Sequence, residues 1–112
     1  MFSGIIEHQA KILSREWGLF RVENSFSGGL KIGQSIAHDG ACMTLTSLTP
    51  EHYEFFVMEE SLRVTNLGEK QSWDTFNVER CIALGERLDG HIVSGHIDTV
   101  GKVSKLEKKD DG

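Results

Sequence analysis

The chain has 112 residues, of which 38% are hydrophobic and 26% are charged, and its formal net charge is −5. This composition is that of one ordinary globular domain, and it excludes the disordered, collagen-like and membrane-spanning classes. The 12 Lys and Arg residues form no dense basic patch among 17 Asp and Glu residues, so neither nucleic acid nor an anionic membrane is an expected partner.

Two segments have the alternation of half-buried β-strands. Residues 17–23 alternate moderately between apolar and polar side chains, and residues 52–58 are rich in aromatic and β-branched side chains. Twelve glycines against a single proline predict many tight turns between such strands.

A β-hairpin is predicted between these two strands. Residues 34–38 and 41–46 flank the dipeptide Asp39-Gly40, which favours a type I′ turn. The turn sets the register, so that Ser35, Ala37, Cys42 and Thr44 share one face and Ile36, Met43 and Leu45 share the other. The face of small residues either faces solvent or leaves room beside the sheet for a flat ligand.

Helical pattern is confined to residues 60–68, which we expect to form one or two turns that end at Gly68 as a C-cap. A strand at 77–84, a turn at 85–90 and a last strand pair within 91–98 follow. About six short strands predict a small closed barrel or a sandwich, and a barrel is favoured because it removes exposed strand edges.

An internal repeat is visible near the two ends of the chain. Residues 4–12 align without gaps on residues 95–103, with Gly, Ile and Lys identical. We therefore expect one structural unit at 1–94 and the start of a second, truncated copy at 95–112. The alternative is that two amphipathic strands merely resemble each other.

Histidines and cysteines are the candidate chemical groups. His91 and His96 stand five residues apart, so neither a strand nor a helix lets both hold one metal ion, and no metal site is expected. Alternation instead places Ser94, His96 and Asp98 on one face, where an imidazole can exchange protons beside a neighbour that holds its tautomer. An ordinary surface histidine is the alternative.

The two thiols allow different interpretations. Cys42 is either a small buried group or a reactive thiol, whereas Cys81 is expected in the core. There is no CxxC pair and no basic stretch followed by an apolar segment at the N-terminus. We therefore expect free thiols in a reducing, cytoplasmic setting.

Five blocks of the sequence resemble the lumazine-binding repeat of the riboflavin synthase family, and they occur in that family's order and spacing. They are residues 1–7, 35–45, 60–68, 77–80 and 90–98. Ser3 and Ser61 stand where the family usually has threonine. The resemblance implies an all-β fold, a six-stranded antiparallel Greek-key barrel with a C-terminal strand or tail that starts a second repeat.

The resemblance also implies a function. Each barrel of the family binds 6,7-dimethyl-8-ribityllumazine or riboflavin, and two tandem barrels form a transferase whose active site lies between an N-terminal barrel of one subunit and a C-terminal barrel of another. Two lumazines give riboflavin and 5-amino-6-ribitylaminouracil by four-carbon transfer, with no metal or redox cofactor. A homo-oligomer is implied, either a dimer of single barrels or a trimer of two-barrel chains. The alternatives are a non-catalytic lumazine or flavin carrier and a purely structural barrel.

Site residues follow from the resemblance position by position. The catalytic candidates are Ser35, Cys42 and His96: His96 to move a proton of the 7-methyl group, and Ser35 or Cys42 to assist nucleophile addition at the 7-position. The substrate-binding candidates are Gly4, Ile5, Ile6, Cys42, Met43, Thr44, Met58, Glu59, Glu60, Ser61, Gly95, His96 and Ile97.

Overall fold

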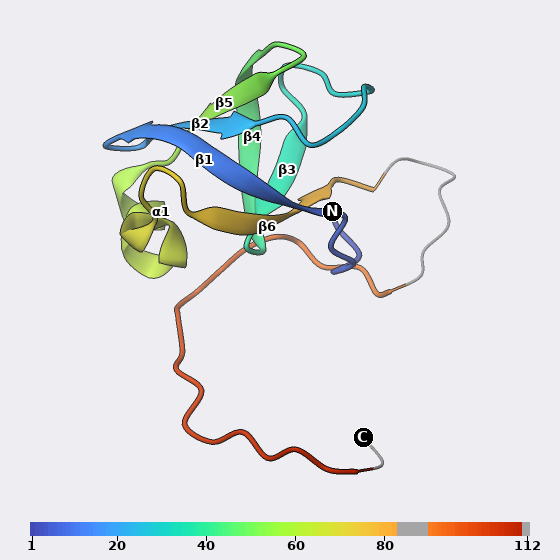
Figure 1. Cartoon of the computed structure of the whole chain (residues 1–112), viewed down its shortest axis with the longest axis vertical. Coiled ribbons are helices and arrows are strands. Elements are labelled where there is room, and N and C mark those ends of the chain that lie inside the picture. Colours follow the sequence, from blue (N-terminus) through green and yellow to red (C-terminus); the bar gives the residue numbers. More distant parts are fainter. Residues whose placement is uncertain (83–89, 111–112) are drawn as a thin grey trace.

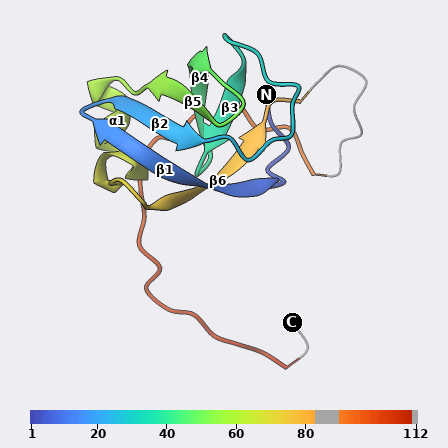
Figure 2. The ribbon, with the colours of Figure 1, turned by 45° about the horizontal axis from the view of Figure 1, so that its top comes forward.

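The computed structural model describes residues 1–82 and 90–110, and its centre is a closed barrel of six antiparallel strands (Figures 1 and 2). The strands are β1 (His8–Glu16), β2 (Leu19–Glu23), β3 (Ser35–His38), β4 (Ala41–Leu48), β5 (His52–Phe56) and β6 (Thr75–Arg80). They are hydrogen-bonded in the order β1-β2-β5-β4-β3-β6. Strands β3, β4 and β5 follow one another as hairpins and β2 lies beside β5, which is a Greek key. The predicted fold is confirmed.

The predicted strands are present with shifted ends. Strand β2 begins only at Leu19, because Trp17, with a φ of 55°, and Gly18 form the turn after β1. Strand β5 ends at Phe56, and β6 begins at Thr75 and ends at Arg80 rather than extending to residue 84. The end of that predicted strand and most of the turn predicted at 85–90 lie outside the described residues.

Apolar side chains from every strand fill the barrel. The fully buried ones include Ile12, Phe20, Val22, Ile36, Leu45, Tyr53, Phe55 and Val78. The rings of Phe20 and Phe55 are stacked, with centroids 5.3 Å apart. Burying a side chain of this size stabilises the fold by roughly 1.5–3 kcal/mol. Register irregularities in β1 and β4 add the local twist that closing a short sheet requires.

The β3–β4 hairpin forms as predicted. Asp39 and Gly40 have φ angles of 48° and 84°, the two positive values of a type I′ turn, and Ala37 pairs with Cys42. Met43 faces the core and Cys42 is exposed, so the face of small residues is the outer surface of the barrel.

The connection from β5 to β6 carries the helical turns, α1 (Glu59–Val64) and the 3₁₀ helix η1 (Asn66–Glu69). The prediction that Gly68 caps a single helix is wrong. The break lies at Thr65, which is extended, and whose hydroxyl accepts a hydrogen bond from the Leu67 amide and starts η1. Among the described residues no helix is long and apolar enough to cross a membrane.

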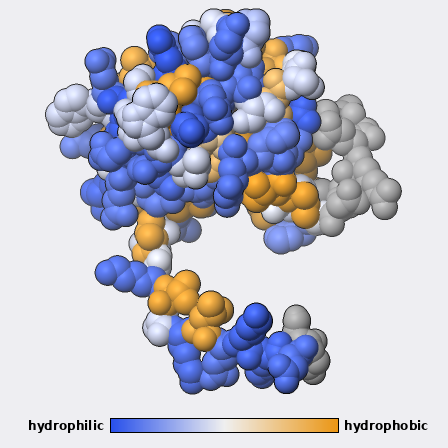
Figure 3. Space-filling model, in the orientation of Figure 1, coloured by the Kyte–Doolittle hydropathy of each residue, from blue (hydrophilic) through white to orange (hydrophobic). Residues whose placement is uncertain are grey.

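The chain after residue 90 passes beneath the end of the barrel where β3 and β4 meet, and then leaves it (Figure 1). The predicted strand pair within 91–98 does not form, because the closed barrel offers no free edge and Val93 makes only an isolated bridge with Phe2. The tail is extended, and Val103 and Leu106 are 85% and 90% exposed. Figure 3 shows hydrophobic surface on the tail. The second repeat stays a prediction.

Candidate functional site

An open groove of about 340 Å³ lies outside the barrel and is bounded by the start of β4, by α1 and by the extended segment 94–98. Its lining residues are Ala41, Cys42, Met43, Glu60, Ser61, Val64, Thr65, Ser94, Gly95, His96, Ile97 and Asp98. We call it the outer groove. Its volume is within the range of small-molecule sites.

Segment 94–98 lies directly on β4, and Gly95 makes this possible. Its carbonyl oxygen accepts a hydrogen bond of 2.9 Å from the Cys42 amide, and its φ is 83°. A Cβ atom at this position would lie 2.8 Å from both Cys42 Cβ and Phe2 Cε2, closer than real Cβ atoms come. Only glycine combines this backbone conformation with this approach.

The N-terminal segment supports the same part of the groove. Phe2 is buried and exchanges two backbone hydrogen bonds with Val93, of 2.8 and 2.7 Å. The carboxylate of Glu79, itself 5% exposed, accepts hydrogen bonds from the Ser3 amide, the Ser3 hydroxyl and the Gly4 amide. One buried carboxylate thus anchors the segment that holds residues 93–95 against the barrel.

His96 is the titratable ring of the groove. Its Nε2 lies 2.9 Å from Asp98 Oδ1, and its backbone amide donates to Ser94 Oγ. The three residues share one face, as predicted, although the segment is not a strand. The His96 side chain is 75% exposed, so an ion pair with Asp98 contributes little to stability and acts mainly on the orientation of the ring.

The helical wall is held by hydrogen bonds at its end. The Ser61 carbonyl accepts from both the amide and the hydroxyl of Thr65, at 3.0 and 2.6 Å. Glu60, one turn before Val64, pairs with Arg63 at 2.6 Å. Glu60 and Ser61 of this wall line the same groove as Cys42 and His96 of the other two walls.

The groove brings together Cys42, Met43, Glu60, Ser61, Gly95, His96 and Ile97 of the predicted site. Thr44, Met58 and Glu59 are exposed but do not line it. Ser35 pairs with Thr44 farther along the hairpin and is partly buried. Gly4, Ile5 and Ile6 are exposed in the N-terminal segment, two or more residues beyond Phe2.

Ala41, Val64 and Thr65 also line the groove and were not predicted. Val64 and Thr65 stand three and four residues after Ser61, the spacing that puts side chains on one side of a helical turn, and this signal points to them. Cys81, predicted in the core, is only partly buried, because it follows the last residue of β6.

A second groove, of about 470 Å³, is a weaker candidate. It lies at the opposite end of the barrel, between the β2–β3 loop and the β4–β5 turn. It is larger than the outer groove but is lined by no titratable side chain, and the Asn24 side chain in it is hydrogen-bonded within the loops. Across residues 1–82 and 90–110, no three His, Cys, Asp or Glu side chains are grouped as a metal ion would require.

The barrel interior is packed rather than hollow. His38 is fully buried there, with Nε2 2.8 Å from the hydroxyl of Tyr53, among the rings of Phe55 and Phe76. Burial lowers the pKa of His38 to about 3 and raises the pKa of Tyr53 above its usual value, so both side chains are neutral. We therefore expect the functional site on the outer surface of the barrel rather than in its interior.

A closed Greek-key barrel with a thiol, an imidazole and carboxylates around an outer groove defines a small barrel domain suited to a small polar ligand. The family model for the lumazine binding domain matches residues 3–81, and the chain belongs to this family.

Several curated proteins that are similar to this chain are named riboflavin synthase. The riboflavin synthase of Escherichia coli strain K12 is 39% identical over 112 residues, which cover 95% of this chain and 53% of that protein. The riboflavin synthase of Mycobacterium tuberculosis strain H37Rv is 37% identical over 109 residues, 92% of this chain and 54% of that protein. That of Schizosaccharomyces pombe is 44% identical over 80 residues, 71% of this chain and 38% of that protein. The chain spans about half the length of the curated relatives that align with nearly all of it.

Proposed function

We propose that the outer groove binds 6,7-dimethyl-8-ribityllumazine or riboflavin, and that the chain supplies one half of a riboflavin synthase active site. The observation that carries this proposal is the convergence of Cys42, Ser61 and His96, from three separate segments, on one groove of a lumazine-binding domain. The hydroxyls of Ser61 and Ser94, which line the groove, suit a ribityl chain.

The proposed reaction transfers four carbons between two lumazines. The acceptor keeps its ring and gains the carbons that make riboflavin, and the donor leaves as 5-amino-6-ribitylaminouracil. Two identical molecules give two products of the same total composition, so no external oxidant or reductant is consumed. The 7-methyl protons are acidic because the ring takes up the negative charge, and no metal or redox cofactor is needed.

Two side chains are proposed to act on the bound lumazine. His96, oriented by Asp98, takes and returns a proton of the 7-methyl group. Cys42, exposed in the groove, assists addition at the electrophilic 7-position. Ser35 is the weaker candidate for that second role, because it does not line the groove.

A single barrel offers one such groove, so donor and acceptor require a second barrel. We propose that it comes from another copy, either in a dimer of single barrels or in a trimer of two-barrel chains, in a reducing cytoplasm that keeps Cys42 and Cys81 as thiols. The second candidate function is a lumazine or flavin carrier, favoured because the outer groove is one site, whereas turnover needs a donor site and an acceptor site.

Measuring turnover distinguishes a riboflavin synthase half-site from a lumazine or flavin carrier. The chain is mixed with 6,7-dimethyl-8-ribityllumazine at high protein concentration, and formation of riboflavin is followed by absorbance. Cys42→Ser and His96→Ala are expected to lower the rate at least tenfold, since single acid–base groups contribute about 10²–10⁴-fold. Cys81→Ser and His8→Ala make matched changes away from the groove and are expected to keep the rate. Binding without turnover supports the carrier, and unchanged rates in the first two variants contradict the assigned roles.

A further inference from the structure

We propose that Asp39, in the turn of the β3–β4 hairpin, is a positioning residue that sets the spacing between the strand wall and the helical wall of the outer groove. The identity of the ligand rests on the proposed function. The positioning role itself rests on the contacts of Asp39 and of the helical connection that it touches.

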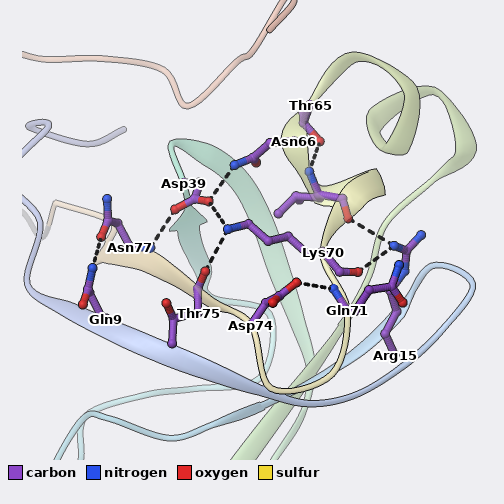
Figure 4. A network of polar contacts seen from close by, with 11 residues as sticks. Gln9, Arg15, Asp39, Thr65, Asn66, Lys70, Gln71, Asp74, Thr75 and Asn77 are labelled. Carbon is purple, nitrogen blue, oxygen red and sulfur yellow. Dashed lines mark hydrogen bonds and ion pairs between the residues drawn. The ribbon is translucent and has the colours of Figure 1, made fainter. Parts of the chain in front are cut away.

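The Asp39 carboxylate is the centre of a polar network (Figure 4). Its Oδ2 accepts a hydrogen bond of 2.7 Å from the Asn66 side-chain amide and lies 3.3 Å from Lys70 Nζ. Its Oδ1 accepts a hydrogen bond of 2.7 Å from the Asn77 backbone amide. The side chains of Asp39 and Lys70 are 16% and 23% exposed, so water screens this pair less than a surface pair.

Asp39 and Asn66 adjoin two walls of the groove, although neither lines it. Asp39 stands two residues before Ala41, the first lining residue of β4. Asn66 directly follows Thr65, the last lining residue of the helical connection. The Asp39 carboxylate therefore links the start of the strand wall to the end of the helical wall. Its contact with the Asn77 amide also fixes this carboxylate to β6.

The 3₁₀ helix η1 is also held from its other side. The Arg15 guanidinium donates to the carbonyls of Gly68 and Lys70, both at 2.8 Å, and Lys70 Nζ donates to the Thr75 carbonyl at 2.8 Å (Figure 4). Because η1 is held to β1 and β6 in this way, losing the Asp39 contact is expected to act on the start of η1, where Asn66 lies next to the lining residue Thr65 at the end of α1.

The chemistry of the contact gives a sharp test. All three partners of Asp39 are donors, so only a group that accepts through both oxygens satisfies them. Asparagine has the same shape and tolerates the φ of 48°, but its NH₂ group would face the donors of Asn66 and Lys70. Changing Asn66 to aspartate restores donor against acceptor between positions 39 and 66, keeps the net charge, and returns a carboxylate to the neighbourhood of Lys70.

The test compares Asp39→Asn, the swap Asp39→Asn/Asn66→Asp, and Asp74→Asn as the control. Asp74 belongs to the same network but its carboxylate accepts only from the Gln71 amide, in the loop before β6. Riboflavin Kd is measured by fluorescence quenching, with circular dichroism to verify folding. We expect Asp39→Asn to raise Kd about tenfold, the swap to return it to within about threefold of the unsubstituted chain, and the control to leave it unchanged.

Two results overturn the proposal: Asp39→Asn binding as tightly as the unsubstituted chain, or the swap remaining as weak as the single variant. If Asp39→Asn does not fold, Lys70→Met removes the cation beside Asp39 together with its hydrogen bond to the Thr75 carbonyl; it is expected to raise Kd about threefold, and an unchanged Kd then overturns the proposal. If the unsubstituted chain binds no riboflavin, the proposed function fails, and amide hydrogen exchange at Thr65 and Leu67 decides the positioning role. Exchange there is expected to be faster in Asp39→Asn and restored in the swap, and unchanged exchange overturns the role.

Discussion

Replacing Gly95 with alanine tests how the outer groove is assembled. The new methyl group would lie 2.8 Å from Cys42 Cβ and from Phe2 Cε2, at a φ of 83°. The left-handed conformation costs a non-glycine residue about 1–2 kcal/mol, and overpacking costs about 1–3 kcal/mol. The combined strain on segment 94–98 is therefore roughly 2–5 kcal/mol.

The hydrogen bonds that hold the segment are of the same size. They are two between Phe2 and Val93 and one from the Cys42 amide to Gly95, and Ile97 adds apolar packing against the core. At about 0.5–1.5 kcal/mol each, the hydrogen bonds supply roughly 1.5–4.5 kcal/mol. Because strain and attachment are comparable, we expect the segment to leave β4 rather than to hold a strained position, and His96 to leave the groove with it.

Amide hydrogen exchange and riboflavin titration report the two consequences. In Gly95→Ala the Cys42 amide is expected to exchange at least tenfold faster, since it loses its acceptor, and riboflavin affinity is expected to fall at least tenfold. Gly101→Ala is the matched control, because a Cβ there meets nothing within 4 Å. Unchanged Cys42 exchange together with unchanged affinity would contradict the expected release of the segment from β4.

Three further predictions concern stability. Glu79→Gln is expected to lower the free energy of unfolding by about 1–3 kcal/mol, because the amide accepts through one oxygen where the carboxylate accepts three hydrogen bonds; urea unfolding measures this, and a change below about 0.5 kcal/mol contradicts it. His38, with a pKa of about 3 when folded and an ordinary value of 6.5, is protonated first in the unfolded chain. It therefore lowers the free energy of unfolding by up to about 1.4 kcal/mol per pH unit as the pH falls from 6.5 toward 3. In thermal melts at several pH values, the stability of His38→Phe should depend less on pH than that of His8→Gln, and equal slopes of stability against pH contradict this. Thr65→Val is expected to cost about 1 kcal/mol in the same urea assay, by removing the side chain that caps η1, and an unchanged midpoint contradicts that role.

Local patterns predicted much of the barrel. The Asp39-Gly40 dipeptide fixes φ angles that admit one hairpin register, and that register is observed. Alternation likewise located β2 and β5, because period two is a property of each strand by itself. The break at Thr65 was not predictable in this way, because it depends on burial of Leu67 against a core that the sequence does not display.

The site was predicted in part. The predicted residues that do and do not line the groove show why. Cys42 and Gly95 are far apart in the sequence, and their contact depends on closure of the barrel and on Phe2, whose two hydrogen bonds seat Val93. Pattern alone placed Ser35 on the same face as Cys42 but not its distance along that face from the groove. Shared orientation follows from strand geometry, whereas the extent of a groove depends on what covers the sheet.

Binding of the flavin or lumazine in the outer groove is measured by titrating isotope-labelled chain with riboflavin and following the amide chemical shifts. We expect saturable shifts at one equivalent of ligand, concentrated at Cys42, Ser61, Gly95 and His96. No saturable shift, or shifts gathered in the β2–β3 loop around Phe26, would contradict it.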